Sequence, residues 1–121
     1  MSKYLDDPFI RILLKESIFT KNQIYTLLDY QWKKARRIKI KTENDKVTIG
    51  ERKIRRETYY NILKSCRIKI KKLLASIILL IYLNVISYDH ITTIINLLKD
   101  LQERRDITIL DTILDELNKI A

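Results

Sequence analysis

Apolar side chains recur every three or four positions along most of this chain, a spacing that places them on one face of an α-helix. The first such stretch is residues 7–18: Asp6 or Asp7 can cap a helix there, and Pro8 suits its first position. A second helix is expected to begin with the capping-box sequence Thr20–Gln23 and to end near Arg37. The pattern therefore predicts two capped helices in the amino-terminal part of the chain.

A third helix, of about 30 residues, is the dominant predicted element. It is expected to start between Glu51 and Glu57 and to end near Val85. Its first half is amphipathic, whereas the segment Leu73–Leu83 is apolar on nearly all sides. Because a helix that is apolar all round is usually buried, we expect this segment to be the hub of the core.

Two shorter amphipathic helices are expected after the long one. The first is capped by Ser87 or Asp89, and the second begins at about Asp106. Apolar residues of the last helix repeat at steps of three and four over about two heptads, which fits either packing within the monomer or a coiled-coil seam. We predict residues 88–121 to be a packing and dimerisation helix pair, with the interface residues Ile107, Leu110, Ile113, Leu114 and Leu117.

Residues 38–50 lack the helical spacing. Alternating residues on both sides of the polar segment Thr42–Asp45 predict a short β-hairpin closed by Gly50, the only glycine; a mobile loop is the alternative. One glycine and one proline in 121 residues also argue against an all-β fold. The predicted fold class is mainly α: a single domain, residues 1–121, of about five helices with one long central helix, and with the hairpin at 38–49, if it forms, as a wing.

Positive charge is concentrated in the middle of the chain. Between Lys33 and Lys72 there are sixteen lysines and arginines against four acids, a local net charge of +12, while the whole chain carries +9. Surface charge that serves only solubility usually mixes the two signs. This basic block therefore predicts a polyanionic partner, with nucleic acid as the first candidate and a phospholipid surface as the second.

Cations and one tyrosine follow one another at steps of three and four along the amphipathic half of the third helix, so they share one face. Arginine can fork onto guanine, lysine can pair with phosphate, and tyrosine can stack or reach a phosphate. The first predicted contact with nucleic acid comprises Arg52, Lys53, Arg55, Arg56, Tyr60, Lys64, Arg67 and Lys71, in which Lys53 joins the row if the helix starts early. A second contact is expected from Arg36, Arg37, Lys39 and Lys41. A solvated helix face and a flexible basic loop are the respective alternatives.

Catalytic chemistry finds little support in the sequence. Cys66 is the only cysteine and His90 the only histidine, and their separation suggests no nucleophile–base pair. One glycine leaves no phosphate-binding loop of the Walker type. We therefore predict a protein that is not an enzyme and uses no cofactor or metal, with Cys66 buried and His90 on the surface. Trp32 and Tyr82 are expected to pack in a core or an interface rather than to stack on bases.

Membrane and export signals are weak. The uncharged run of eleven residues in the third helix is shorter than the roughly 20 residues that cross a bilayer. The amino terminus is polar and acidic, unlike a signal peptide. We therefore expect a cytoplasmic protein and keep a membrane-surface adaptor only as an alternative.

The stretch Arg56–Lys64 (RETYYNILK), preceded by the capped helix Thr20–Arg37, resembles the helix-turn-helix of small archaeal and archaeal-virus DNA-binding regulators. The resemblance covers roughly residues 7–72. A tight helix-turn-helix has a turn of three or four residues, whereas about 15 separate the two helices here, so the hairpin would be an insertion. The resemblance implies a recognition helix that begins at Thr58, Tyr59 and Tyr60, with Arg55 and Arg56 just ahead of it.

Together these features predict a homodimeric regulator of transcription that binds double-stranded DNA without catalysing a reaction. One alternative is a helical subunit of a ribonucleoprotein or nucleic-acid-processing complex that uses the same face on RNA or single strands. The other is the membrane-surface adaptor.

Overall fold

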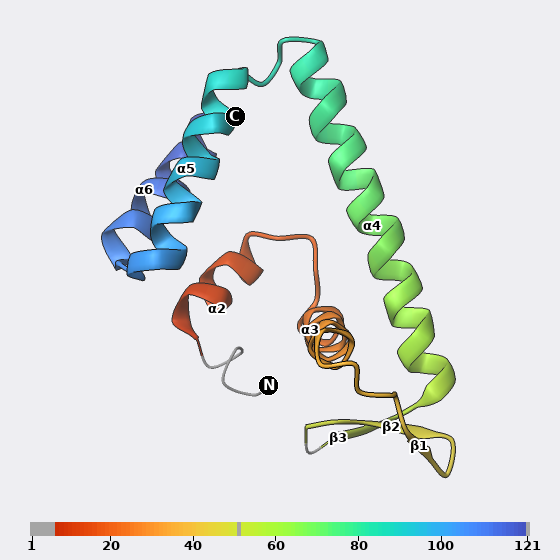
Figure 1. The fold of residues 1–121 in the computed structure, drawn as a ribbon. Helices are drawn as coiled ribbons and strands as arrows, with labels where there is room; N and C mark the ends of the chain where they lie inside the picture. The colour runs from red at the N-terminus through yellow and green to blue at the C-terminus, as the bar shows by residue number, and fades with distance from the viewer. Residues whose placement is uncertain (1–6, 51, 121) are drawn as a thin grey trace. The chain divides into compact units, whose positions relative to one another are not determined.

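A computed structural model describes residues 7–50 and 52–120 of the chain. In these residues the chain forms five helices and one three-stranded antiparallel sheet, and it is 71% helical (Figure 1). The mainly α fold class is therefore confirmed. The elements in chain order are α2 (Pro8–Lys15), α3 (Lys21–Ala35), β1 (Thr42–Glu43), β2 (Lys46–Ile49), β3 (Arg52–Arg55), α4 (Arg56–Tyr82), α5 (Tyr88–Arg104) and α6 (Ile107–Ile120).

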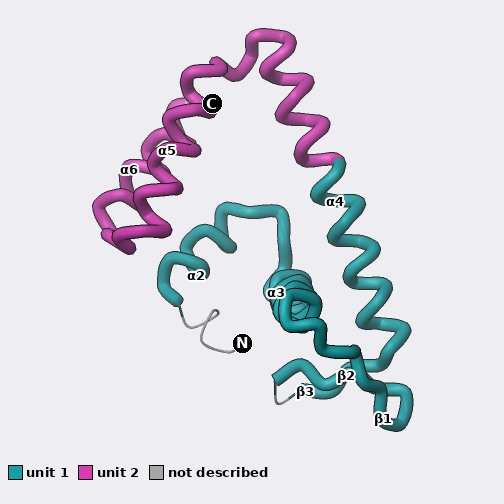
Figure 2. The backbone as a smooth tube through the Cα atoms, viewed as in Figure 1, with its two compact units in different colours: residues 1–71 teal, residues 72–121 magenta. Residues whose placement is uncertain are grey.

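The chain divides into two compact units, residues 1–71 and residues 72–121 (Figure 2). Helix α4 supplies residues 56–71 to the first unit and 72–82 to the second. Every residue predicted to contact nucleic acid belongs to the first unit, and the predicted helix pair 88–121 belongs to the second.

Both helix caps predicted near the amino terminus are present. A carboxylate oxygen of Asp7 accepts a hydrogen bond from the Phe9 amide at 2.9 Å, and Pro8 occupies the first helical position of α2. Thr20 and Gln23 form a complete capping box at the start of α3, with N···O distances of 2.9 and 3.2 Å. These local signals fix where the two helices begin.

Three helices end earlier than the apolar pattern predicts. α2 ends at Lys15 rather than near residue 18, α3 at Ala35 rather than 37, and α4 at Tyr82 rather than 85. Arg37 and Asn84 lie just beyond α3 and α4 with φ of 54° and 59°. Because a left-handed residue cannot continue a right-handed helix, the backbone stops α3 and α4 although apolar residues follow.

The segment between α3 and α4 is a meander of three strands rather than one hairpin. β1 and β2 are joined through Asn44 and Asp45, which both have positive φ (53° and 61°), as in the two-residue turns that match strand twist. Gly50, with φ of 59°, follows β2 at the next turn. The predicted hairpin is thus present, but its first strand is Thr42–Glu43 rather than residues 38–41, so it spans residues 42–49 instead of 38–49. Arg52–Arg55 add a third strand to it. Lys53 therefore lies on a strand and does not extend the helical row.

The core of the first unit lies where the sheet meets α3 and the first turns of α4. Alternate residues of β2 are buried, so one face of the sheet turns toward the helices. The buried cluster consists of Val47, Ile49, Tyr59 and Leu63, with Leu27, Tyr30, Ile40 and Ile54 packed against it.

In the second unit α5 and α6 lie side by side (Figure 1). Leu101, Leu110 and Ile113 are buried in this contact. His90 is partly buried there as well: its Nε2 lies 2.8 Å from the main-chain oxygen of Glu116, and its Nδ1 lies 3.3 Å from a carboxylate oxygen of that residue. The prediction that His90 is simply a surface residue is therefore wrong, because a long-range partner on α6 holds it.

The apolar end of α4 is not the hub of a core. Leu74, Ile78 and Tyr82 expose 56%, 68% and 82% of their surfaces, so the predicted burial of this segment, Tyr82 included, is wrong. Hydrophobicity shows that a segment can be buried but not that another element covers it. Across residues 7–50 and 52–120, none of the helices combines the length and the apolar content that crossing a membrane requires.

Candidate nucleic-acid interface

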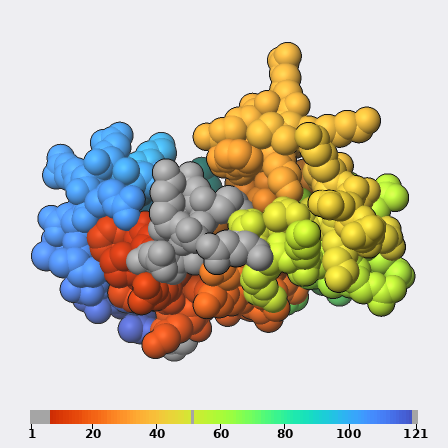
Figure 3. All heavy atoms as spheres, turned by 90° about the horizontal axis from the view of Figure 1, so that it is seen from below, coloured from red at the N-terminus to blue at the C-terminus, as the bar shows by residue number. Residues whose placement is uncertain are grey.

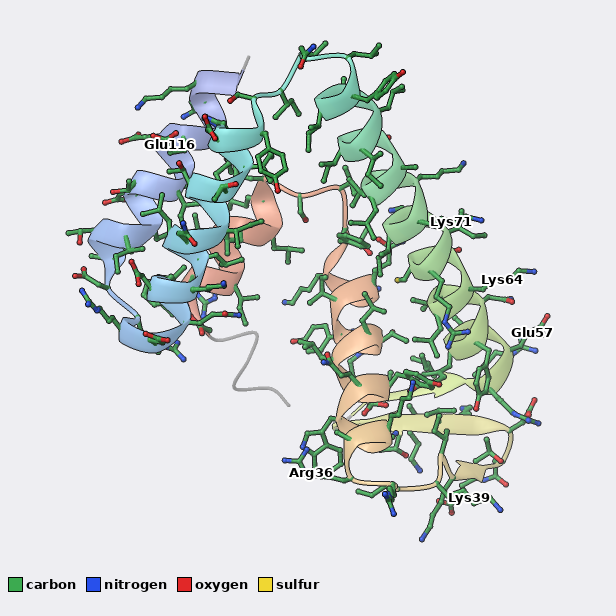
Figure 4. The ribbon with its side chains drawn as sticks, turned by 45° about the horizontal axis from the view of Figure 1, so that its top comes forward. Arg36, Lys39, Glu57, Lys64, Lys71 and Glu116 are labelled. Carbon is green, nitrogen blue, oxygen red and sulfur yellow. The ribbon has the colours of Figure 1, made fainter. Side chains whose placement is uncertain are left out.

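The predicted row on α4 forms as a single exposed strip within the first unit. Its members, which we call the basic row, are Arg56, Tyr60, Lys64, Arg67 and Lys71, and all five are exposed. At 100° per residue they lie within an arc of about 80°, and the row is about 22 Å long. Figure 4 shows Lys64 and Lys71 projecting from the side of α4 that faces away from α3.

Aromatic rings support the two arginines of the basic row. The guanidinium of Arg56 lies 5.8 Å from the centre of the Tyr60 ring, and that of Arg67 lies 5.6 Å from the centre of the Tyr30 ring on α3. Such cation–π contacts hold the guanidinium without neutralising its charge. Lys64 and Lys71 have no hydrogen bond or ion pair within the described part of the chain. The row therefore presents two positioned arginines and two free lysines.

Within the described residues, nearly all cations of the basic block, residues 33–72, lack an ion pair with an acidic side chain. Among its described members only Lys33 forms an ion pair, with Asp29 at 2.8 Å. Glu43, Asp45 and Glu57 form none with the residues that the structure describes. A surface with this much unpaired charge of one sign attracts polyanions over a distance of about one Debye length.

Two lysines of the block are held by the protein itself. Lys33 also donates to the main-chain oxygen of Thr48 at 3.1 Å. Lys69 donates to the main-chain oxygen of Ile18 at 3.1 Å and to Oε1 of Gln23 at 3.0 Å. Neither belongs to the predicted interface. Their contacts join elements of the first unit to one another.

The strand register gives the sheet a basic outer face. Lys46 is directly opposite Arg55, and Thr48 is opposite Lys53, so these four side chains share the face turned away from the buried Val47. Like charges directly opposite each other destabilise a sheet, and a bound anion would relieve that repulsion. Lys46 was missed by the sequence reasoning, although the alternation in β2 already placed it on this face.

Arg52 lies on the other face of the sheet. It is opposite Ile49 in the register and donates a hydrogen bond to Oδ1 of Asn22 on α3 at 3.1 Å. The structure therefore separates Arg52 from Lys53 and Arg55, with which the sequence grouped it.

The second predicted contact lies at the carboxyl end of α3 and in the link to the sheet. Arg36, Arg37, Lys39 and Lys41 are all exposed. The Arg36 guanidinium stacks over the Trp32 ring at 4.5 Å, and Trp32 is half-buried rather than part of the core of the first unit. Figure 4 shows Arg36 and Lys39 at the sheet end of α3, and in Figure 3 the side chains of this orange-to-yellow segment stand out from the surface.

Tyr59 cannot read a base, although the resemblance placed it at the start of a recognition helix. Its side chain is fully buried, and its hydroxyl donates to Oδ2 of Asp29 at 3.0 Å. Burial, aided by this hydrogen bond, raises the pKa of the Tyr59 hydroxyl. Thr58 and Tyr60 on either side of it are exposed.

The predicted dimer residues on α6 divide into two groups. Leu110 and Ile113 are buried within the second unit, whereas Ile107 and Leu117 are exposed and Leu114 is half-buried. Two of the five residues of the seam that the sequence suggested are therefore used for packing α6 within the second unit.

Groups suited to other chemistry are scattered. In the ranges 7–50 and 52–120 no three histidine, cysteine or acidic side chains come together as a metal site would require. Cys66 is buried, as predicted; its Sγ lies 3.9 Å from the main-chain oxygen of Gln23, and burial raises the pKa of the thiol. Comparison with protein families, with curated proteins and with solved structures finds no match.

Proposed function

We propose that this protein is a non-catalytic DNA-binding regulator that contacts double-stranded DNA through the basic row, with α4 taking the part of a recognition helix. The observation that carries the proposal is a row of exposed cations on one face of this helix, with no acidic residue among them. The outer face of the sheet, with Lys46, Lys53 and Arg55, would act as a wing on flanking phosphates. We further propose that it acts as a homodimer in the cytoplasm.

The geometry favours a duplex over single strands. A helix fits the major groove, which is about 12 Å wide, and a straight row of cations can follow its phosphates. Proteins that bind single strands usually offer a platform of aromatic rings. The outer face of the sheet offers none, and Tyr60 is the only ring in the basic row.

A titration of duplex DNA, single-stranded DNA and RNA over a range of salt concentrations tests the proposal. If about six cations contact phosphates, log K should fall with log salt with a slope near −5 on duplex DNA. If the protein binds duplex DNA more weakly than single strands or RNA, the regulator proposal is wrong. The protein would then be assigned as a subunit of a ribonucleoprotein or nucleic-acid-processing complex.

Substitutions locate the interface. Replacing both Lys64 and Lys71 by glutamine should make the slope shallower by about two, since each phosphate contact contributes about 0.9. The matched control replaces Lys15 and Lys99, two exposed lysines outside the block, and should leave the slope unchanged. Changing Arg56, Lys64, Arg67 and Lys71 together to glutamate should abolish binding while circular dichroism shows unchanged helicity. If the variant at Lys64 and Lys71 and the control variant have equal slopes, the basic row is not part of the interface.

A further inference from the structure

The face of α4 that carries the basic row changes character one turn after Lys71. Leu74, Ile78 and Tyr82 follow Lys71 at steps of three, four and four, so they continue the same helical face. All three are exposed by more than half of their surface. The face is thus cationic in residues 56–71 and apolar in residues 74–82.

The exposed apolar surface extends beyond the helix. It comprises Leu74, Ile78, Leu79, Tyr82, Leu83, Val85 and Tyr88, which we call the apolar patch, and all seven belong to the second unit. Together these side chains expose roughly 800 Å², about what one partner contributes to a standard interface and more than a monomer usually leaves open. A surface of this size and composition indicates a protein contact.

We propose that the apolar patch binds the apolar patch of a second copy of this chain. No charged residue lies between Lys72 and Asp89, so a partner surface must also be apolar and uncharged. Elsewhere in the described ranges, the exposed large apolar side chains are scattered: Tyr60, Ile68 and Ile70 lie among the basic residues of α4, and the others lie singly or in pairs on α5, α6 and the linkers. The patch itself is therefore the larger uncharged apolar surface that the chain supplies.

Charge selects the direction of the pairing. The patch is flanked by Lys72 at one end and Asp89 at the other, and both are exposed. Antiparallel pairing about a two-fold axis brings Lys72 of each copy toward Asp89 of the other. Parallel pairing would instead bring Lys72 of one copy toward Lys72 of the other and Asp89 toward Asp89, which like-charge repulsion disfavours. The dimer is therefore antiparallel across this segment. This interface differs from the seam on α6 and does not depend on DNA binding.

Sedimentation of the full-length protein over a range of concentrations tests the proposal. The wild type should have twice the chain mass of 14.5 kDa, and Ile78→Asp should shift it to the single-chain mass. Leu117→Asp, on the exposed side of α6, is the matched control and should remain dimeric. Because Ile78 is exposed, the variant should keep the helical circular dichroism of the wild type.

Charge exchange tests the direction. Lys72→Asp should weaken the dimer at least several-fold, and adding Asp89→Lys to it should restore the wild-type dissociation constant. A wild type that stays monomeric at about 100 μM would overturn the proposal. So would a dimer that is broken by Leu117→Asp but not by Ile78→Asp, and a charge exchange that does not rescue would refute the antiparallel arrangement.

Discussion

Replacing Tyr59 by phenylalanine removes one hydroxyl group from the most buried polar contact of the first unit. The ring is fully buried, and its hydroxyl donates to Oδ2 of Asp29. The same carboxylate oxygen forms an ion pair with Lys33. Phenylalanine keeps the ring and its packing beside Leu63 and Val47. The substitution therefore isolates one hydrogen bond to a buried carboxylate.

A hydrogen bond to a charged group contributes about 1.5–3 kcal/mol. Because Lys33 still pairs with Asp29 in the variant, we expect a loss near the lower end, about 2 kcal/mol. With a urea slope near 2 kcal/mol/M, the unfolding midpoint should fall by about 1 M. The fluorescence of Trp32, the only tryptophan, reports the unfolding of the first unit. Tyr60→Phe alters the exposed neighbour and should stay within about 0.5 kcal/mol of the wild type.

Alkaline pH gives a second, independent measure of the same contact. Burial and the bond to Asp29 raise the pKa of Tyr59 above the value of about 10 that tyrosine has in an unfolded chain. The stabilisation is therefore complete below pH 10 and is lost as the pH rises toward the folded pKa. The difference in unfolding free energy between wild type and Tyr59→Phe should be constant from pH 7 to 9 and shrink above pH 10. A variant as stable as the wild type, or a difference that persists unchanged at pH 11, would refute the reasoning.

Two further predictions separate structural from interface residues. Lys69→Met should lower stability by about 1–2 kcal/mol, because it removes donors to Ile18 and Gln23, and should leave the salt slope of DNA binding unchanged. Lys71→Met should do the reverse, with wild-type urea unfolding and a slope shallower by about one; the same outcome for both would contradict the assignment. The Cys66 thiol should react with a disulfide reagent at pH 8 on the order of 100-fold more slowly in the folded protein than in urea, since burial blocks access and raises its pKa. Equal rates would show that Cys66 is accessible.

Helix positions follow from the sequence because their signals are local. The caps at Asp7 and Thr20 are formed by neighbouring residues, and the structure shows both. The ends depend on single backbone conformations. Arg37 and Asn84 adopt positive φ although neither is glycine, and the apolar spacing continues past them. The periodicity therefore predicts the helices and misplaces their ends by two or three residues.

The sequence pattern did not predict the third strand or the exposure of the end of α4, for a different reason. Arg52–Arg55 contains one apolar residue, Ile54, and becomes a strand because β2 offers it an edge. Leu74 and Ile78 stay exposed because neither α5 nor α6 covers them. In both cases the outcome depends on a partner distant in sequence or in another molecule, which a local pattern does not contain.

The count of basic residues overstates the binding surface, and the structure limits how many phosphates it can reach. Lys64, Lys69 and Lys71 lie on one helix, yet Lys69 lies about 150° around it and is bound to the start of α3. Lys33 and Arg52 are likewise held by the first unit. The basic row supplies four cations and the outer face of the sheet three, so these two surfaces together allow a slope of at most about −6 per bound protomer, against about −14 for all sixteen residues of the block. A measured slope steeper than about −6 per bound protomer would mean that the link at 36–41 also touches DNA, because that link holds the remaining exposed cations nearest the sheet.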